Sequence, residues 1–139
     1  MSDVLGYQGK NVVVTGAASG MGEAAAQLLV DSGANVYALD IADVSVAVAG
    51  AIKVDMKDQA SLDAAVSELP DVIYALFNCA GVPSPPVPMQ DTVLINFSGL
   101  RYLTECLLSR IEEGGAIASI ASTAGMGWKP NLKLSLIHI

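Results

Sequence analysis

The sequence predicts an α/β protein with a parallel, doubly wound β-sheet. Short aliphatic runs alternate with segments of helical spacing, which is typical of βαβ units, whose right-handed crossovers produce parallel strands. Hydrophobic residues make up 53% of the chain and charged residues 15%. Strands made almost wholly of Val, Ile, Leu and Ala usually belong to parallel sheets that helices cover on both faces. A length of 139 residues suits a single domain.

Five strands are expected where aliphatic runs end at glycine, proline or polar residues. They cover residues 11–15, 35–39, 51–54, 72–77 and 116–120. Helical spacing predicts helices at residues 20–31, 58–69 and 91–113. Residues 41–50 mix valines with alanines, so a short helix and a loop both remain open there. Residues 82–88 hold four prolines, which predict a loop.

Charge and composition exclude several classes of function. Fourteen acidic residues against seven basic ones give a net charge of −7, which disfavours nucleic acid and anionic membrane surfaces as partners. The sequence has no apolar run long enough to span a membrane and no signal-peptide pattern at its start. Cys79 and Cys106 form no metal-binding or disulfide pattern. A reduced, cytoplasmic protein without a metal site is expected.

A glycine-rich turn follows the first strand and directly precedes the first helix. Glycines let backbone N–H groups approach a pyrophosphate, and a helix N-terminus favours its negative charge. The residues expected to bind the pyrophosphate are Gly16, Ser19, Gly20, Met21 and Gly22. A tight turn that only needs small residues is the alternative explanation for these glycines.

Asp40 decides between these two explanations. It ends the second strand 18 residues after Gly22, where a carboxylate can accept hydrogen bonds from the hydroxyls of an adenosine ribose. No Lys or Arg lies between Ala17 and Asp40 or directly after Asp40, so a 2′-phosphate would find no counter-charge. The sequence therefore predicts a dinucleotide site that takes NAD rather than NADP.

The motifs resemble those of the short-chain dehydrogenase/reductase family. The pattern Thr-Gly-x-x-x-Gly-x-Gly runs from Thr15 to Gly22, and Asn-Cys-Ala-Gly follows the fourth strand at residues 78–81. Three further segments fit in order along residues 10 to about 132: Asp55, Asn96 within Ile-Asn-Phe-Ser-Gly, and Ser122 within Ile-Ala-Ser-Thr-Ala-Gly. The proline-rich link after Gly81 and residues 125–132 are similar to the 3α-hydroxysteroid dehydrogenase/carbonyl reductase and coniferyl-alcohol dehydrogenase subgroup.

The resemblance implies a Rossmann-type sheet with the strand order 3-2-1-4-5, five of the family's seven strands. It also implies hydride transfer between NAD(H) and an alcohol or ketone, such as a steroid or an aromatic alcohol. Ser122 would bind the substrate oxygen, and Asn96 would hold a proton-relay water. The implied cofactor contacts beyond the glycine turn and Asp40 are Asp55 and Met56 at the adenine, and Asn78, Ala80 and Gly81 beside the cofactor. Homo-oligomers are expected for the full-length protein.

Each implied role has a structural alternative. Asn78 could join neighbouring strands through its amide, and Asp55 could be an acidic residue at the N-terminus of a helix. Asn96 is a poor helix former and could bend its helix. Ser122 could be an ordinary loop serine. Cys79 most simply packs as a small hydrophobic residue.

The family's Tyr-x-x-x-Lys pair, expected after Ser122, is absent from the sequence. All four tyrosines precede Ser122, namely Tyr7, Tyr37, Tyr74 and Tyr102. Residues 1–133 are therefore expected to form the N-terminal part of one NAD-binding domain without dehydrogenase activity of its own. The alternative is an NAD-binding module that does not catalyse. Residues 134–139, which include His138, match the translation of a sequencing-adapter end and are expected to be non-native; a native apolar strand is the alternative.

Overall fold

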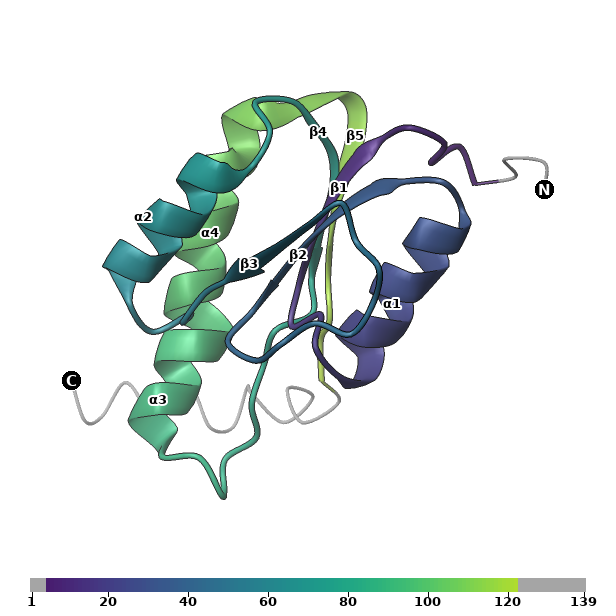
Figure 1. Ribbon diagram of the computed structural model, residues 1–139. Helices are drawn as coiled ribbons and strands as arrows, with labels where there is room; N and C mark the ends of the chain where they lie inside the picture. Colours follow the sequence, from purple (N-terminus) through teal and green to yellow (C-terminus); the bar gives the residue numbers. More distant parts are fainter. Residues whose placement is uncertain (1–4, 123–139) are drawn as a thin grey trace.

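The computed structural model describes residues 5–122 and shows five parallel strands in one sheet (Figure 1). The strand order is β3-β2-β1-β4-β5, so the predicted fold class and strand order are confirmed. The strands are β1 (Asn11–Thr15), β2 (Asn35–Asp40), β3 (Gly50–Lys53), β4 (Ile73–Asn78) and β5 (Ile111–Ser119). The order reverses between β1 and β4, which makes their carboxyl ends the switch point of the sheet.

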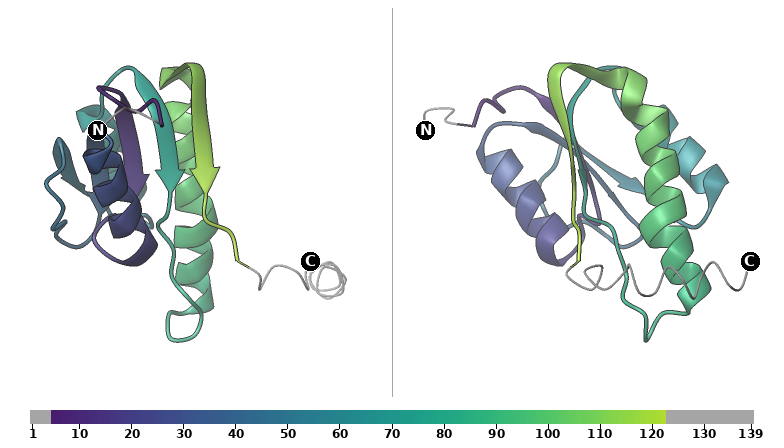
Figure 2. Two further views of the ribbon diagram at one scale, coloured as in Figure 1. Left: turned by 90° about the vertical axis from the view of Figure 1, so that its right-hand side faces the viewer. Right: turned by 180° about the vertical axis from the view of Figure 1, so that it is seen from behind.

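Helices cover both faces of this sheet. Helix α1 (Gly20–Asp31) lies on one side, and α2 (Gln59–Glu68) and α4 (Leu100–Leu107) lie together on the other (Figure 1). Helix α4 continues a short α3 (Met89–Val93) and a π-helical segment, η1 (Leu94–Gly99), and a 3₁₀ turn, η2 (Leu108–Arg110), ends it. The arrowheads of β1, β4 and β5 point to the same end of the molecule (Figure 2).

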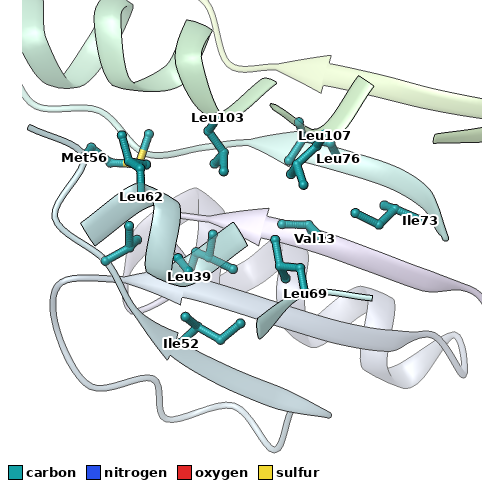
Figure 3. Close-up of a cluster of buried hydrophobic side chains, with 12 residues drawn as sticks. Val13, Leu39, Ile52, Met56, Leu62, Leu69, Ile73, Leu76, Leu103 and Leu107 are labelled. Carbon is teal, nitrogen blue, oxygen red and sulfur yellow. The ribbon is translucent and has the colours of Figure 1, made fainter. Parts of the chain in front are cut away.

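Alternation along β1 divides the hydrophobic core into two layers. Val13 faces α2 and α4, whereas Val12 and Val14 face α1. Figure 3 shows the first layer, in which Leu103 and Leu107 of α4 lie over Leu76 of β4. These three leucines are fully buried. The strands are apolar on both faces because both faces are covered, as the sequence predicts.

The predicted helix over residues 91–113 differs from the structure in both length and regularity. The helical stretch begins at Met89, contains the π-helical segment η1 and ends at Arg110. Strand β5 then begins at Ile111, which pairs with Ile73, rather than at residue 116. Gly114 has a φ of +81°, and the register between β4 and β5 shifts beside it, so the glycines interrupt a strand instead of ending a helix.

The other predicted elements agree with the structure to within about two residues. Residues 41–49 contain neither helix nor strand, which settles the open choice there in favour of a loop. Gly50 opens β3, one residue before the expected start.

Arg110 caps the C-terminus of α2 from a distant part of the chain. Its guanidinium donates hydrogen bonds to the carbonyls of Val66 at 2.9 Å, Leu69 at 3.1 Å and Pro70 at 3.4 Å. Carbonyls at a helix C-terminus lack partners within the helix and carry partial negative charge, so a cation is favourable there. This contact joins the end of α4 to the end of α2.

Replacing Arg110 with Met should lower the free energy of unfolding by about 1–2 kcal/mol, because the carbonyls lose a charged donor. Chemical denaturation of both proteins measures the difference. Arg101→Met is the matched control: Arg101 pairs only with the exposed Glu105 on its own helix, so its loss should cost about 0.5 kcal/mol or less. Equal effects of the two substitutions would contradict the capping role.

Candidate functional site

A cleft of about 530 Å³ lies at the carboxyl ends of the strands, beside the switch point between β1 and β4. Its size is within the usual range for a ligand site. The lining includes every predicted cofactor residue except Asn78: Gly16, Ser19, Gly20, Met21, Gly22, Asp40, Asp55, Met56, Ala80 and Gly81. The structure thus brings together residues that lie up to 65 positions apart in the sequence.

At two positions of the glycine turn, Gly16 and Gly22, a Cβ atom would clash with neighbouring backbone atoms. Gly16 has a φ of +67°, and a Cβ there would lie 2.7 Å from Cα of Ala80. A Cβ on Gly22 would overlap the carbonyl oxygen of Gly16. Ser19 precedes α1 as its N-cap residue and makes no capping hydrogen bond with its side chain. The first N–H groups of α1 therefore remain available to an anion in the cleft.

The Asp40 carboxylate lies at the end of β2 and holds the glycine turn. Oδ2 accepts a hydrogen bond from the backbone N–H of Ala18 at 2.9 Å, and Oδ1 accepts one from Ala42 at 2.8 Å. Each carboxylate oxygen can accept more than one hydrogen bond, so both can still receive hydroxyl donors from a ligand. Asp40 thus fixes the turn and leaves acceptors at the edge of the cleft.

The segment after β3 forms the opposite side of the cleft. Oδ1 of Asp55 accepts a hydrogen bond from the backbone N–H of Lys57 at 2.9 Å. The Lys57 ammonium lies 2.9 Å from Oδ2 of Asp91, and this hydrogen bond raises the pKa of Lys57. Asp58, not Asp55, is the N-cap of α2 and accepts a hydrogen bond from the N–H of Ala60. Asp55 therefore lies three residues before the N-cap of α2.

Thr15 joins β1 to the segment after β4, and the sequence analysis did not single it out. Its buried Oγ1 accepts hydrogen bonds from the backbone N–H groups of Cys79 at 3.1 Å and Ala80 at 3.0 Å. The signal in the sequence was a polar residue at the end of an otherwise aliphatic strand. Burial raises the pKa of the Cys79 thiol, so this cysteine stays neutral beside the cleft.

Asn78 lies in the sheet and not in the lining of the cleft. Its Nδ2 donates to Oγ1 of Thr104 at 3.1 Å and to Oγ of Ser119 at 3.3 Å, which ties β4 to α4 and β5. Its buried Oδ1 has no hydrogen-bond partner within residues 5–122. This geometry matches the joining role that the sequence left open.

Asn96 lies in the π-helical segment η1, which interrupts the regular α-helical hydrogen bonding between α3 and α4. Its Oδ1 accepts from the N–H of Val82 at 2.8 Å, and its Nδ2 donates to the carbonyl of Val82, also at 2.8 Å. The amide therefore holds the loop that follows β4.

Ser122 follows β5 by three residues, at the carboxyl edge of the sheet. It is exposed and is not part of the lining of the cleft. The N–H of Ile120 continues the pairing with β4 by donating to the carbonyl of Asn78 at 3.0 Å. The predicted non-native segment at residues 134–139 lies outside the described residues.

Among residues 5–122, no group of three or more His, Cys, Asp or Glu side chains is placed to hold a metal ion. Nor does any helix in that range have the length and hydropathy needed to cross a membrane.

The sequence model described as short chain dehydrogenase matches residues 10–133. The chain belongs to the short-chain dehydrogenase family. It is 39% identical to a coniferyl-alcohol dehydrogenase of Pseudomonas sp., over 90% of the chain and 49% of that protein.

Two other proteins show the same relationship. A 2-dehydro-3-deoxy-L-rhamnonate dehydrogenase (NAD(+)) of Sphingomonas sp. is 30% identical to this chain, over 90% of the chain and 58% of that protein. The ligand-free aldohexose dehydrogenase of Thermoplasma acidophilum superposes with a TM-score of 0.72 at 26% identity, over 84% of this chain and 50% of that one. The chain thus spans about half the length of the dehydrogenases that it matches.

Replacing Thr15 with Val should lower the free energy of unfolding by about 2–4 kcal/mol, because two backbone N–H groups lose their acceptor at almost unchanged side-chain volume. Urea denaturation measures the loss. Thr15→Ser keeps the hydroxyl and should cost clearly less. If the Val and Ser variants were equally stable, the hydroxyl would not be what joins β1 to β4.

Proposed function

We propose that the cleft binds NAD and that the full protein is an NAD-dependent alcohol dehydrogenase or carbonyl reductase. The main support for the proposal is that the glycine turn and the Asp40 carboxylate both line the cleft at the switch point of the sheet. The turn leads into α1 and lies beside Asp40, which accepts a hydrogen bond from Ala18 of that turn. A helix N-terminus suits a pyrophosphate, and a carboxylate at the end of β2 suits a ribose diol.

The residues present fit a dinucleotide. Gly20 has a φ of +58° and open space where a Cβ would lie, so a pyrophosphate could approach the N–H groups of Ser19 to Gly22. Asp40 would accept hydrogen bonds from the adenosine ribose. Asp55 and Met56 would contact the adenine, and Ala80 and Gly81 would border the rest of the cofactor. The cofactor named for the Sphingomonas relative supports the choice of NAD.

The dehydrogenase chemistry would divide between cofactor and protein. A bound nicotinamide supplies the hydride acceptor or donor. In the full protein, Ser122 would donate a hydrogen bond to the substrate oxygen at the carboxyl edge of the sheet. Asn96 would hold the loop after β4 in place through Val82 and, in its second proposed role, position a proton-relay water. The 139 residues contain no Tyr-x-x-x-Lys pair, so the chain by itself should bind the cofactor without turnover.

The proposed substrate is a small alcohol or its carbonyl counterpart. The similarity to coniferyl-alcohol dehydrogenase favours an aromatic alcohol within this class. We further propose that residues 1–133 form part of one NAD-binding domain and that residues 134–139 are not native. The cytoplasmic location and homo-oligomeric assembly of the full protein stay predictions.

A second candidate is a module that binds NAD but does not catalyse. It stays the alternative function for these 139 residues, which contain no Tyr-x-x-x-Lys pair. If the native reading frame continues into a Tyr-x-x-x-Lys pair, the candidate without catalysis is wrong.

Replacing Asp40 with Ala should weaken NADH binding at least about tenfold, because the ribose loses a charged acceptor worth about 1.5–3 kcal/mol. Fluorescence titration of bound NADH gives the dissociation constants. The matched control is Asp71→Ala, which removes the same charge just before the amino end of β4 and should bind NADH normally. Unchanged affinity in a folded Asp40→Ala protein would contradict the ribose contact.

The 139-residue chain should bind NADH yet oxidise no alcohol. The test follows NADH absorbance at 340 nm with coniferyl alcohol as the probe, beside a protein extended by its native reading frame. In the extended protein, Ser122→Ala should reduce kcat by about a hundredfold or more and leave the dissociation constant for NADH unchanged. Turnover by the 139 residues alone would show that the missing pair is dispensable.

A further inference from the structure

Lys53 is a cation that the fold places beside Asp40. It is the last residue of β3, and its register partner across the parallel ladder is Asp40. Residues paired across a sheet project on the same face, and Ile52 and Val54 on either side of Lys53 belong to the core layer on the α2 and α4 side. Lys53 therefore projects, with Asp40, toward the α1 side of the sheet.

The ammonium of Lys53 is not free in this position. Nζ lies 2.7 Å from Oδ1 of Asp43 and donates a hydrogen bond to the carbonyl of Ile41 at 3.2 Å. Ile41 follows Asp40 directly and lines the cleft. Both side chains of the ion pair are largely exposed, at 62% for Lys53 and 96% for Asp43, so the lysine can turn if its partner is removed.

The loop that carries Asp43 is anchored at several points although it has no regular secondary structure. Oδ1 of Asp40 accepts from the N–H of Ala42, and Oγ of Ser45 donates to Oε1 of Glu23 at 2.7 Å. Valines of the loop pack against the core layer that faces α1. These contacts hold Asp43 close to the end of β2, beside Lys53.

The charges at this end of the cleft bear on the choice of cofactor. A 2′-phosphate would bring up to two additional negative charges to the ribose. Asp40, Asp43 and Glu23 are acidic, and Lys53 is the cation that the β2–β3 register places among them. The hydrogen bond from Lys53 lowers the pKa of Asp43, so Asp43 is ionised at neutral pH.

We infer that the ion pair between Lys53 and Asp43 is a second determinant of cofactor choice, in addition to Asp40. Asp43 neutralises the ammonium and holds it against the carbonyl of Ile41, so a 2′-phosphate meets Asp40 with no available counter-charge. Once Asp43 is neutral, Lys53 can turn toward the ribose and pair with the phosphate. This inference rests on the proposed binding of NAD in the cleft.

The test compares the dissociation constants of NADH and NADPH for the 139-residue chain and its variants, by fluorescence titration at low ionic strength. Asp43→Asn should improve the affinity for NADPH relative to NADH by about two- to fivefold, the range expected for an exposed ion pair. The gain should shrink as salt is added, because the new pair is exposed. Asp43→Glu keeps the charge and should keep the original preference.

Two controls separate the freed lysine from a simple loss of negative charge. The double variant Asp43→Asn with Lys53→Met should lose most of the gain, because the cation is gone. Glu23→Gln removes one negative charge from the same region without releasing Lys53 and should give a smaller gain than Asp43→Asn.

The outcomes distinguish this inference from the proposed function. If the unaltered chain binds NADH and Asp43→Asn leaves the ratio of affinities unchanged, the ion pair has no part in the choice and the inference fails alone. An equal gain in the double variant also overturns it, since the lysine would then contribute nothing. If the unaltered chain binds neither nucleotide, the proposed function is wrong, and the inference about the ion pair is wrong as well.

Discussion

The close approach of the glycine turn to the segment after β4 is the constraint on which the site depends. Gly16 lies against Ala80 where no Cβ would fit, and the hydroxyl of Thr15 accepts both N–H groups that emerge from the end of β4. Without that hydroxyl, two partly buried donors would lose their acceptor, at a cost of about 2–4 kcal/mol. These contacts join the end of β1 to the segment that follows β4, and the cleft lies next to them at the carboxyl ends of the strands.

The rest of the cleft follows from these contacts. Because Gly16 is held against β4, the turn that follows it points the first N–H groups of α1 into the cleft, and Gly22 lets the helix fold back over the carbonyl of Gly16. Asp40 then fixes the other side of the turn through the N–H of Ala18. Each of these groups has a structural role in the protein alone and leaves hydrogen-bonding capacity for a ligand. The site is therefore formed in advance of binding, which lowers the entropic cost of holding a cofactor.

The sequence predicts those features of the fold and the site that depend on residues close together in the chain. The glycines of the turn, the strand that ends at Asp40 and the strand order all follow from short-range patterns and from the family resemblance. The start of β5 at Ile111 could not be predicted, because it depends on pairing with Ile73 across the sheet. Lys53 was missed for the same reason: only the register between β2 and β3 places it beside Asp40. The capping of α2 by Arg110 joins two helix ends that no local pattern connects.

The π-helical segment η1 shows how packing at the site overrides a regular helix. A π-helical turn adds a residue and shifts the phase of the side chains that follow. Here Asn96 can reach the backbone of Val82 on the cleft side, while Leu103 and Leu107, about two and three turns further on, still point into the core. Gly99 ends the segment where a Cβ would overlap the carbonyl oxygen of Met56, so the helix lies directly on the segment that forms the adenine side of the cleft. The same helical stretch thus sets the position of both walls: Val82 through Asn96, and Met56 through Gly99. Any movement of this stretch would change the two walls together, which couples the proposed adenine contacts to the loop that follows β4.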